Sequence, residues 1–175
     1  MKRVLITGAN SFVGVNVEKW LLQTPDEFIV ETVDTMNEAW KKADFAKYDV
    51  VFHVAGIAHV DPKPKMAPLY YKVNRDLTIE IAKWAKKHGV KQFIFMSSKI
   101  VYHASKSLKG DVITENTKPH PNDFYGDSKL QAENGLRKLE SSSFKVALLR
   151  PCMIYGLGNC LLYTSPSPRD STSSR

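Results

Sequence analysis

Residues 4–14, Val-Leu-Ile-Thr-Gly-Ala-Asn-Ser-Phe-Val-Gly, form the stretch of sequence that decides the expected fold. It opens with a short apolar run that ends at a glycine, which is typical of a strand buried in a parallel sheet. Apolar side chains then recur at helical spacing at Val13, Val17 and Leu21. A strand, a glycine turn and a helix in this order predict the first unit of an alternating α/β fold.

The rest of the chain repeats this alternation of strands and helices. We expect further strands over residues 28–33, 50–55, 93–96 and 145–149, and helices over residues 73–88 and 125–139. Apolar runs that alternate with helices predict an α/β architecture with a doubly wound parallel sheet, the Rossmann fold. Residues 35–48 barely suffice for the helix and strand that such a fold places there, so we expect a shrunken or missing element.

The composition excludes several classes of protein. The 175 residues are 43% hydrophobic and 25% charged, as in one globular domain, and no apolar run approaches the roughly 20 residues of a membrane helix. Two cysteines cannot build a disulfide framework or a cysteine-rich metal site, so we expect a reduced, cytoplasmic protein without a metal. The net charge of +7 is spread along the chain, which favours solvated helix faces over a nucleic-acid-binding surface.

The composition changes at Cys160. Residues 160–175 are rich in serine and proline and show neither a helical nor a strand period. Such a segment is either a disordered natural tail or a foreign one. We favour the second interpretation, because the segment resembles the translation of a transposase-end sequencing adapter joined in frame at Asn159. We therefore expect a natural domain over residues 1–159 and a non-native tail over residues 160–175.

The glycine turn after the first strand has the features of a phosphate-binding site. Glycine permits a tight turn and a close approach of the backbone, and free amides at a helix N-terminus attract a pyrophosphate. Asp34 follows the second expected strand, where a carboxylate can accept hydrogen bonds from a ribose and repels a 2′-phosphate. Turn and acid together predict dinucleotide binding, with NAD preferred over NADP. The alternative is a purely structural glycine turn with Asp34 as a cap.

A tyrosine and a lysine stand four residues apart at the start of the last expected helix. Tyr125 and Lys129 therefore share one helix face, whereas the same spacing at Tyr102 and Lys106 leads into a loop rich in serine and lysine. A tyrosine titrates near about 10, and a neighbouring ammonium group lowers that pKa because it favours the phenolate. We expect the pair at Tyr125 to carry proton transfer.

These features resemble the extended short-chain dehydrogenase/reductases, in the NAD-dependent epimerase/dehydratase group. The glycine turn fits the family pattern TGxxGxxG except at Ser11, and Tyr125-Gly-x-Ser-Lys is the family's own form of the tyrosine–lysine pair. Residues 150–159 are similar to the family segment RPxxVYGPG, where the cofactor domain meets the substrate-binding loops. The resemblance covers residues 2–159 and implies a C-terminally truncated NAD-binding Rossmann domain with an incomplete substrate-binding subdomain.

The resemblance implies a catalytic site and an NAD site. Ser98 would orient the reacting oxygen, Tyr125 would take a proton from a sugar hydroxyl, and Lys129 would also hold the nicotinamide ribose. The implied cofactor-binding residues are Gly8, Asn10, Ser11, Phe12, Val13, Gly14, Asp34, Asp44, Phe45, Val54, Ala55, Gly56, Asn74, Tyr125 and Lys129. The Asp44-Phe45 pair is matched to the adenine, and Asn74 to an asparagine that orders the active site.

The residues after Ser98 favour one branch of the family. The 4,6-dehydratase branch has an acidic pair there, whereas this chain has Lys99 and Ile100, so elimination of water lacks an acid and a base. The resemblance therefore implies an NAD-dependent 4-epimerase that acts on a UDP-linked nucleotide sugar by transient hydride transfer. A nucleotide-4-keto-sugar reductase and a dinucleotide-binding protein without turnover are the alternatives.

The same resemblance implies a homodimeric parent enzyme in polysaccharide biosynthesis. Most contacts to the nucleotide sugar would come from sequence beyond Asn159. We therefore expect the 175-residue polypeptide itself to be inactive.

Overall fold

A computed structural model describes residues 1–58, 64–102, 112–152 and 154 of the chain. The described residues form one parallel sheet with the strand order β2-β1-β3-β4-β5. The strands are β1 (Lys2–Thr7), β2 (Phe28–Val33), β3 (Val50–His53), β4 (Gln92–Met96) and β5 (Lys145–Leu149). Every expected strand is present, and the doubly wound parallel sheet is confirmed. The expected tail, residues 160–175, lies outside the described residues.

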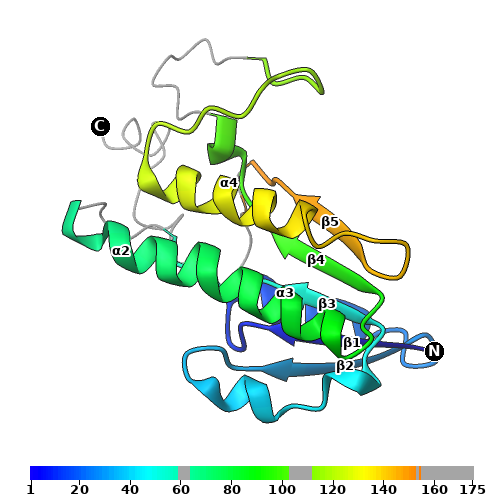
Figure 1. Ribbon diagram of the computed structural model, residues 1–175. Helices are drawn as coiled ribbons and strands as arrows, with labels where there is room; N and C mark the ends of the chain where they lie inside the picture. Colours follow the sequence, from blue (N-terminus) through cyan, green and yellow to red (C-terminus); the bar gives the residue numbers. More distant parts are fainter. Residues whose placement is uncertain (59–63, 103–111, 153, 155–175) are drawn as a thin grey trace, which may run out of the picture.

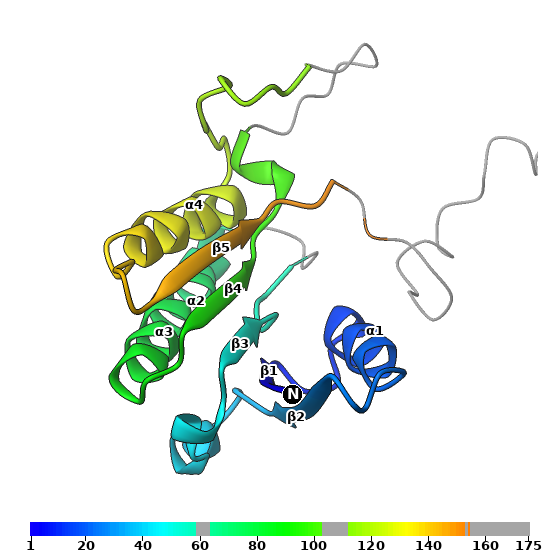
Figure 2. The ribbon, with the colours of Figure 1, turned by 90° about the vertical axis from the view of Figure 1, so that its right-hand side faces the viewer.

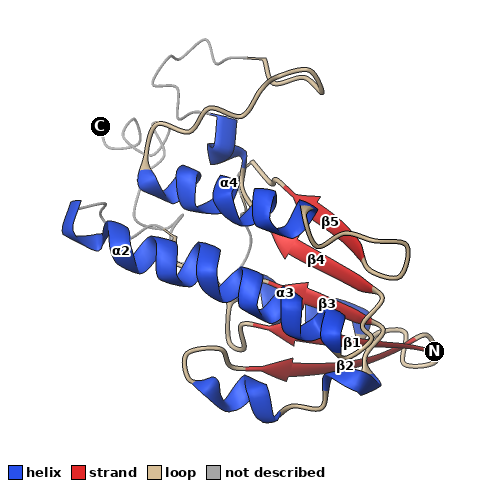
Figure 3. Cartoon of the chain, in the orientation of Figure 1, coloured by secondary structure: helices blue, strands red, loops and turns tan. Residues whose placement is uncertain are grey.

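Helices cover both faces of the sheet (Figures 1 and 2). Helix α1 lies on one face, and α2, α3 and α4 lie on the other. Their bounds are α1 (Phe12–Leu21), α2 (Ala67–Tyr70), α3 (Thr78–Lys87) and α4 (Phe124–Arg137). The short 3₁₀ segments are η1 (Glu38–Lys42), η2 (Phe45–Lys47), η3 (Pro64–Met66) and η5 (Lys99–Tyr102), and the π-helix η4 (Tyr71–Leu77) joins α2 to α3 (Figure 3). Within the described part of the chain, no helix has the length and apolarity needed to cross a membrane.

The core consists of one layer on each face of the sheet. Successive side chains of a strand point to opposite faces, so β1 contributes to both layers. Val4 and Ile6 pack with α1, while Leu5 belongs to the cluster that contains Ile81 of α3 and Leu136 of α4. This two-sided burial explains why the first strand is a continuous apolar run in the sequence.

The connection between β2 and β3 is shortened, as expected. Residues 35–48 contain only the two 3₁₀ segments η1 and η2, so β2 stays at the edge of the sheet. The indole of Trp40 is 2% exposed and meets Phe45 and Trp84 edge to face, with ring centroids 6.3 and 6.1 Å away. The Trp40 side chain thus occupies the space beside the sheet that a longer connection would otherwise fill.

The helix over residues 67–87 is not α-helical throughout, although the apolar spacing of the sequence predicts an α-helix. An α-helix is present in α2 and α3, but η4 between them is a π-helix. Across η4 the buried positions lie four residues apart, at Tyr70, Asn74 and Thr78, whereas α3 buries Ile81, Ala82 and Ala85 at ordinary helical spacing. A strict spacing of four drifts around an α-helix, which has about 3.6 residues per turn. The wider π turn keeps these side chains on one face.

Gly8 and Gly89 provide a test of the close approach between the ends of β1 and β3. Both have positive φ, 110° and 83°. A Cβ atom at Gly8 would lie 2.7 Å from the backbone nitrogen of Ala55, whereas one at Gly89 would meet no described atom within 4 Å. We predict that Gly89→Ala lowers the free energy of unfolding by about 1–2 kcal/mol through backbone strain alone. Gly8→Ala adds overpacking and should lower it by about 2–5 kcal/mol.

Urea unfolding of both variants measures this difference. Equal losses for the two substitutions would contradict a backbone contact between the strand ends.

Candidate functional site

The predicted site residues gather at the carboxyl edge of the sheet. Gly8 follows β1, Asp34 follows β2, Val54 follows β3, and Ser98 lies just beyond β4. The chain leaves β1 toward β2 on one side and later returns to β3 on the other. In open parallel sheets, ligands bind at this point, where the strand order reverses.

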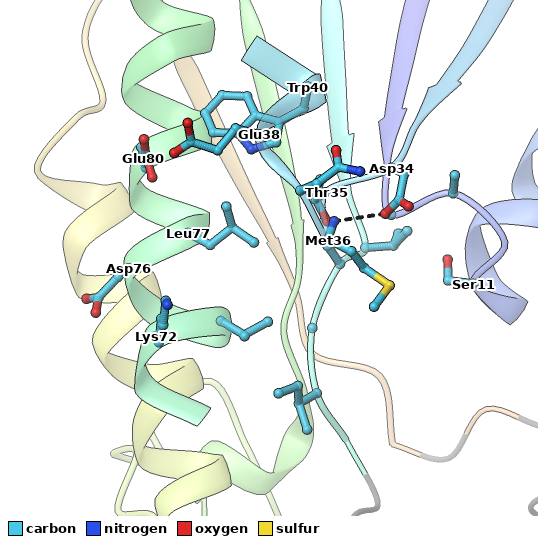
Figure 4. A pocket seen from close by; sticks show the side chains of 18 of the residues that line it. Ser11, Asp34, Thr35, Met36, Glu38, Trp40, Lys72, Asp76, Leu77 and Glu80 are labelled. Carbon is cyan, nitrogen blue, oxygen red and sulfur yellow. Dashed lines mark hydrogen bonds between the residues drawn. The ribbon is translucent and has the colours of Figure 1, made fainter. Parts of the chain in front are cut away.

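A cavity of about 1030 Å³ opens there, between the strand ends and the long helix (Figure 4). Asp34 and Met36 lie on the strand side, and Lys72 and Leu77 lie on the helix side. Of the predicted cofactor residues, the cavity is lined by Gly8, Asn10, Ser11, Asp34, Val54, Ala55 and Gly56. Its volume is at the upper end of the roughly 300–1,000 Å³ typical of small-molecule sites.

The glycine turn is built by two residues in the left-handed region and closed by a cap. Gly8 and Asn10 have φ of 110° and 65°, and asparagine tolerates this conformation better than most residues. Ser11 is the N-cap of α1, and its hydroxyl oxygen accepts a hydrogen bond from the Gly14 nitrogen at 3.1 Å. The serine that replaces the family's middle glycine therefore satisfies one helix amide itself. The predicted residues Phe12 and Val13 form the first turn of this helix and are not among the described residues lining the cavity.

Asp34 lies at the rim of the cavity. Its Oδ1 accepts a hydrogen bond from the Met36 nitrogen at 2.9 Å, drawn as a dashed line in Figure 4. This Asx turn fixes the carboxylate where the chain leaves β2. The Met36 side chain is 94% exposed beside it. The rim thus combines the Asp34 carboxylate, fixed by a hydrogen bond, with the solvent-exposed apolar side chain of Met36.

The structure does not bring Asp44 and Phe45 into the cavity. Asp44 is the N-cap of η2 and accepts a hydrogen bond from the Ala46 nitrogen at 3.1 Å. Phe45 is fully buried in the core against Trp40. Neither Asp44 nor Phe45 is among the described residues that line the cavity. Because the β2–β3 connection is so short, its phenylalanine is needed for packing.

Lys129, Asn74 and Gly56 converge beside the cavity. A Cβ atom at Gly56 would lie 3.0 Å from both the Nζ of Lys129 and the Oδ1 of Asn74. The Lys129 ammonium donates to the carbonyl oxygen of Met96 at 2.9 Å and lies 4.7 Å from the centre of the Phe95 ring. Burial lowers the pKa of Lys129 to about 8, partly opposed by the nearby Glu133 carboxylate. Gly56 lines the cavity, and the other two residues lie directly behind it.

Tyr125 and Ser98 are brought together, as predicted. Tyr125 lies in the first turn of α4, which Asp123 caps by accepting a hydrogen bond from the Gly126 nitrogen. The Ser98 side chain lies close enough to the phenol to influence its pKa. Burial raises the pKa of Tyr125, and the nearby Ser98 hydroxyl opposes this rise. The chain alone does not lower the pKa of Tyr125, because its Lys129 ammonium binds a carbonyl, and the lowered pKa that we expect with a bound cofactor stays a prediction.

Sequence reasoning missed a buried ion pair next to these residues. The carboxylate of Glu133, which is fully buried, accepts hydrogen bonds from Ser97 Oγ at 2.6 Å and Arg150 Nε at 2.9 Å. Arg150 also binds the second carboxylate oxygen and the Tyr102 hydroxyl. The pair ties the ends of β4 and β5 to α4. The sequence does carry a signal for Glu133. It follows Lys129 by four residues, just as Lys129 follows Tyr125, and this spacing favours one helix face.

Comparisons with known proteins show which family this chain resembles. The family model for the NAD dependent epimerase/dehydratase family matches residues 4–169. Over 178 aligned residues the chain is 34% identical to the UDP-glucose 4-epimerase of Vibrio cholerae, covering 90% of this chain and 53% of that protein. The chain spans about half the length of the curated relatives it matches. The family match runs past residue 159, and the foreign origin of residues 160–175 stays a prediction.

Solved structures share the fold. The UDP-glucuronic acid 4-epimerase from Bacillus cereus in complex with NAD superposes with a TM-score of 0.73 and 22% identity, covering 88% of this chain and 57% of that one. RMD from Pseudomonas aeruginosa, complexed with NADPH, gives a TM-score of 0.75 and 24% identity, covering 90% and 57%.

The buried lysine yields a prediction about stability and pH. The pKa of Lys129 is lowered from 10.5 to about 8 in the folded chain, so between these values the unfolded chain binds more protons. The contribution of Lys129 to the free energy of unfolding therefore rises as the pH rises from about 8 to 10.5. At pH 7 the lysine is charged, and its burial opposes folding. We predict that Lys129→Met raises the free energy of unfolding at pH 7 by about 1–3 kcal/mol. This advantage should shrink toward pH 10.

Thermal unfolding at pH 7 and pH 9.5 checks the prediction. Lys138→Met, at the exposed C-cap of the same helix, is the matched control and should change little. A melting temperature of Lys129→Met at or below that of the unchanged chain at pH 7 would contradict it.

Proposed function

This chain belongs to the NAD-dependent epimerase/dehydratase family, and from this premise we propose that it is the cofactor-binding half of a nucleotide-sugar 4-epimerase. The observation that carries the proposal is the group at the carboxyl edge. The Tyr125 phenol lies close to the Ser98 side chain, and Lys129 is buried on the same face of α4. A protein that only binds a dinucleotide has no need for a tyrosine at this position.

The residues that line the cavity fit a dinucleotide. The space between the strand ends is bounded by backbone, because a Cβ atom at Gly8 would lie 2.7 Å from Ala55. The turn from Gly8 to Ser11 would hold the pyrophosphate, Asp34 would hold the adenosine ribose, and Lys129 would hold the nicotinamide ribose. NAD, when bound, supplies a hydride acceptor and donor.

The chain's own residues would manage the proton. Ser98 would hydrogen-bond the reacting sugar oxygen and orient it toward Tyr125. The phenol would take the hydroxyl proton while C4 gives up its hydride, and would return that proton to the same oxygen when a hydride adds to the opposite face of C4. Lys99 and Ile100 follow Ser98, so no carboxylate stands there to expel water from the sugar. This sequence supports epimerisation or reduction at C4 over dehydration.

The partners of the whole protein follow the same proposal. The Vibrio cholerae relative is named for UDP-glucose, which supports a UDP-linked sugar as the substrate. We further propose a cytoplasmic, homodimeric parent enzyme that uses neither nucleic acid nor a membrane as a partner.

The first prediction concerns the tyrosine. In a protein that carries this chain at the full length of its relatives, Tyr125→Phe should reduce kcat for UDP-sugar epimerisation by roughly 100- to 10,000-fold, because proton transfer is lost. The affinity for NAD, measured by fluorescence titration, should change little. Tyr48→Phe is the matched control, since that hydroxyl binds Glu31 on β2, away from the site. Unchanged turnover by Tyr125→Phe would exclude this tyrosine as the catalytic group.

The second prediction concerns the choice of cofactor. The 175-residue chain should bind NAD more tightly than NADP, because the Asp34 carboxylate repels a 2′-phosphate. Asp34→Asn should narrow that preference at least tenfold, mainly by strengthening NADP binding. Calorimetric titration with both nucleotides measures the ratio. A preference that survives the substitution unchanged would show that Asp34 does not discriminate between them.

A further inference from the structure

His53 ends β3 on the face of the sheet opposite to α1 and is fully buried. Its imidazole stacks on Phe93 and Phe95, with ring centroids 5.7 and 5.9 Å away. It does not belong to the proposed chemistry. Its two nitrogens nevertheless have hydrogen-bond partners, because Nδ1 lies 2.6 Å from Thr7 Oγ1 and Nε2 lies 3.0 Å from Thr78 Oγ1.

The donors in this group can be assigned from one hydroxyl. Thr78 Oγ1 donates its single hydrogen to the carbonyl oxygen of Asn74 at 2.8 Å. It must therefore accept from His53, so the imidazole carries its proton on Nε2. The other nitrogen is then an acceptor, and the Thr7 hydroxyl donates to it. The hydrogen bonds run in one direction, from Thr7 through His53 and Thr78 to Asn74.

The imidazole is neutral in this arrangement. Burial lowers the pKa of His53 to about 3, and the positive charge of Lys129 acts in the same direction. A neutral ring with a fixed tautomer has one donor and one acceptor, which the two threonine hydroxyls match.

The hydrogen bonds end on the π-helix η4. Asn74 stands within it, and its side chain is the bridge between three segments. Its Oδ1 accepts from the Ile57 nitrogen at 2.8 Å, and its Nδ2 donates to the Ile57 oxygen at 3.1 Å and to Ser128 Oγ at 3.2 Å. Ser128 donates in turn to the carbonyl oxygen of Tyr125 at 2.8 Å. Ile57 lines the cavity, so Asn74 joins the cavity wall to the helix that carries the tyrosine.

We propose that His53 is a positioning residue, whose hydrogen bonds to Thr7 and Thr78 connect the phosphate-binding turn to Asn74. Asn74 passes this restraint to Ile57 and to the first turn of α4. π-Helical turns are rare and are held by specific contacts, and the Thr78 hydroxyl supplies one at the Asn74 carbonyl. We call the hydrogen bonds from Thr7 through His53 and Thr78 to Asn74 the relay. They are present in the chain without any ligand. The use of the relay to couple a bound dinucleotide to Tyr125 rests on the proposed function.

The tautomer is the first test. A long-range ¹H–¹⁵N spectrum of the ¹⁵N-labelled chain should show His53 with its proton on Nε2 at pH 7, unchanged at pH 5. A proton on Nδ1, or titration of this ring between pH 5 and pH 7, would overturn the direction of the relay.

The second test breaks the relay without changing its shape. Thr78→Val removes the hydroxyl between His53 and Asn74, and the amide of Ile57 should then exchange its hydrogen at least tenfold faster. The amide of Val90, bonded to Ala85 at 3.1 Å, should keep its rate in the same sample, which separates local release from general destabilisation. Thr78→Ser restores a hydroxyl and should restore slow exchange at Ile57.

Thr32→Val, on the exposed side of β2, is the matched control and should leave Ile57 unchanged. Equal acceleration at Ile57 and Val90, or no acceleration at Ile57, would overturn the relay.

The third test adds NAD at a saturating concentration. In the unchanged chain, NAD should slow exchange at the Ile57 amide, and in Thr78→Val this slowing should be lost although NAD still binds. Binding without any change at Ile57 in the unchanged chain would overturn the coupling. Failure of the chain to bind NAD at all would instead overturn the proposed function, while the tautomer and the Thr78→Val exchange rates still decide the relay.

Discussion

The backbone of Gly8 passes so close to Ala55 that no side chain fits between them, and the site depends on this contact. The carbonyl oxygen of Thr7 accepts hydrogen bonds from the nitrogens of both Val54 and Ala55, each at 3.0 Å. Two strand ends are therefore locked together where the chain reverses its direction across the sheet. The cavity opens above backbone at this point, and the side chains that line it approach from the surrounding elements. Because the backbone at the strand ends is fixed and the surrounding side chains can vary, one fold can bind different substrates.

The chemistry at this edge is held by buried polar groups. Lys129 donates to a strand carbonyl, Glu133 binds Ser97 and Arg150, and His53 joins two threonines. Each group lost hydration on folding and regains part of that loss through hydrogen bonds of fixed direction. Apolar side chains of the same volume would avoid this desolvation cost, but they would not fix the orientation of α4 through directional hydrogen bonds. The helix α4 is therefore located by polar contacts as much as by its apolar face.

The sequence was sufficient for the strands, the glycine turn and the placement of Tyr125 and Lys129 on one helix, because each has a local signature. The π-helix had no such signature, since the apolar residues of this segment recur as in an α-helix and the buried positions that fit the π turn include the polar Asn74 and Thr78. The burial of Phe45 depends on Trp40 and Trp84, which come from separate segments, so no local pattern reveals it. Gly135 shows the same limit. In sequence it is a weak point of a helix, yet the Ile79 side chain lies 2.4 Å from where its Cβ would stand.

The shortened connection after β2 has a consequence for the behaviour of the molecule in concentrated solution. It leaves β2 at the boundary of the sheet, and an unpaired strand edge is a template on which another chain can add. Glu31 stands in this strand, with Arg3 at 3.3 Å and Lys47 at 3.8 Å. Charged side chains on an edge strand oppose such pairing, because another strand would have to desolvate them. The charge cluster thus opposes pairing of β2 with the strand of another chain.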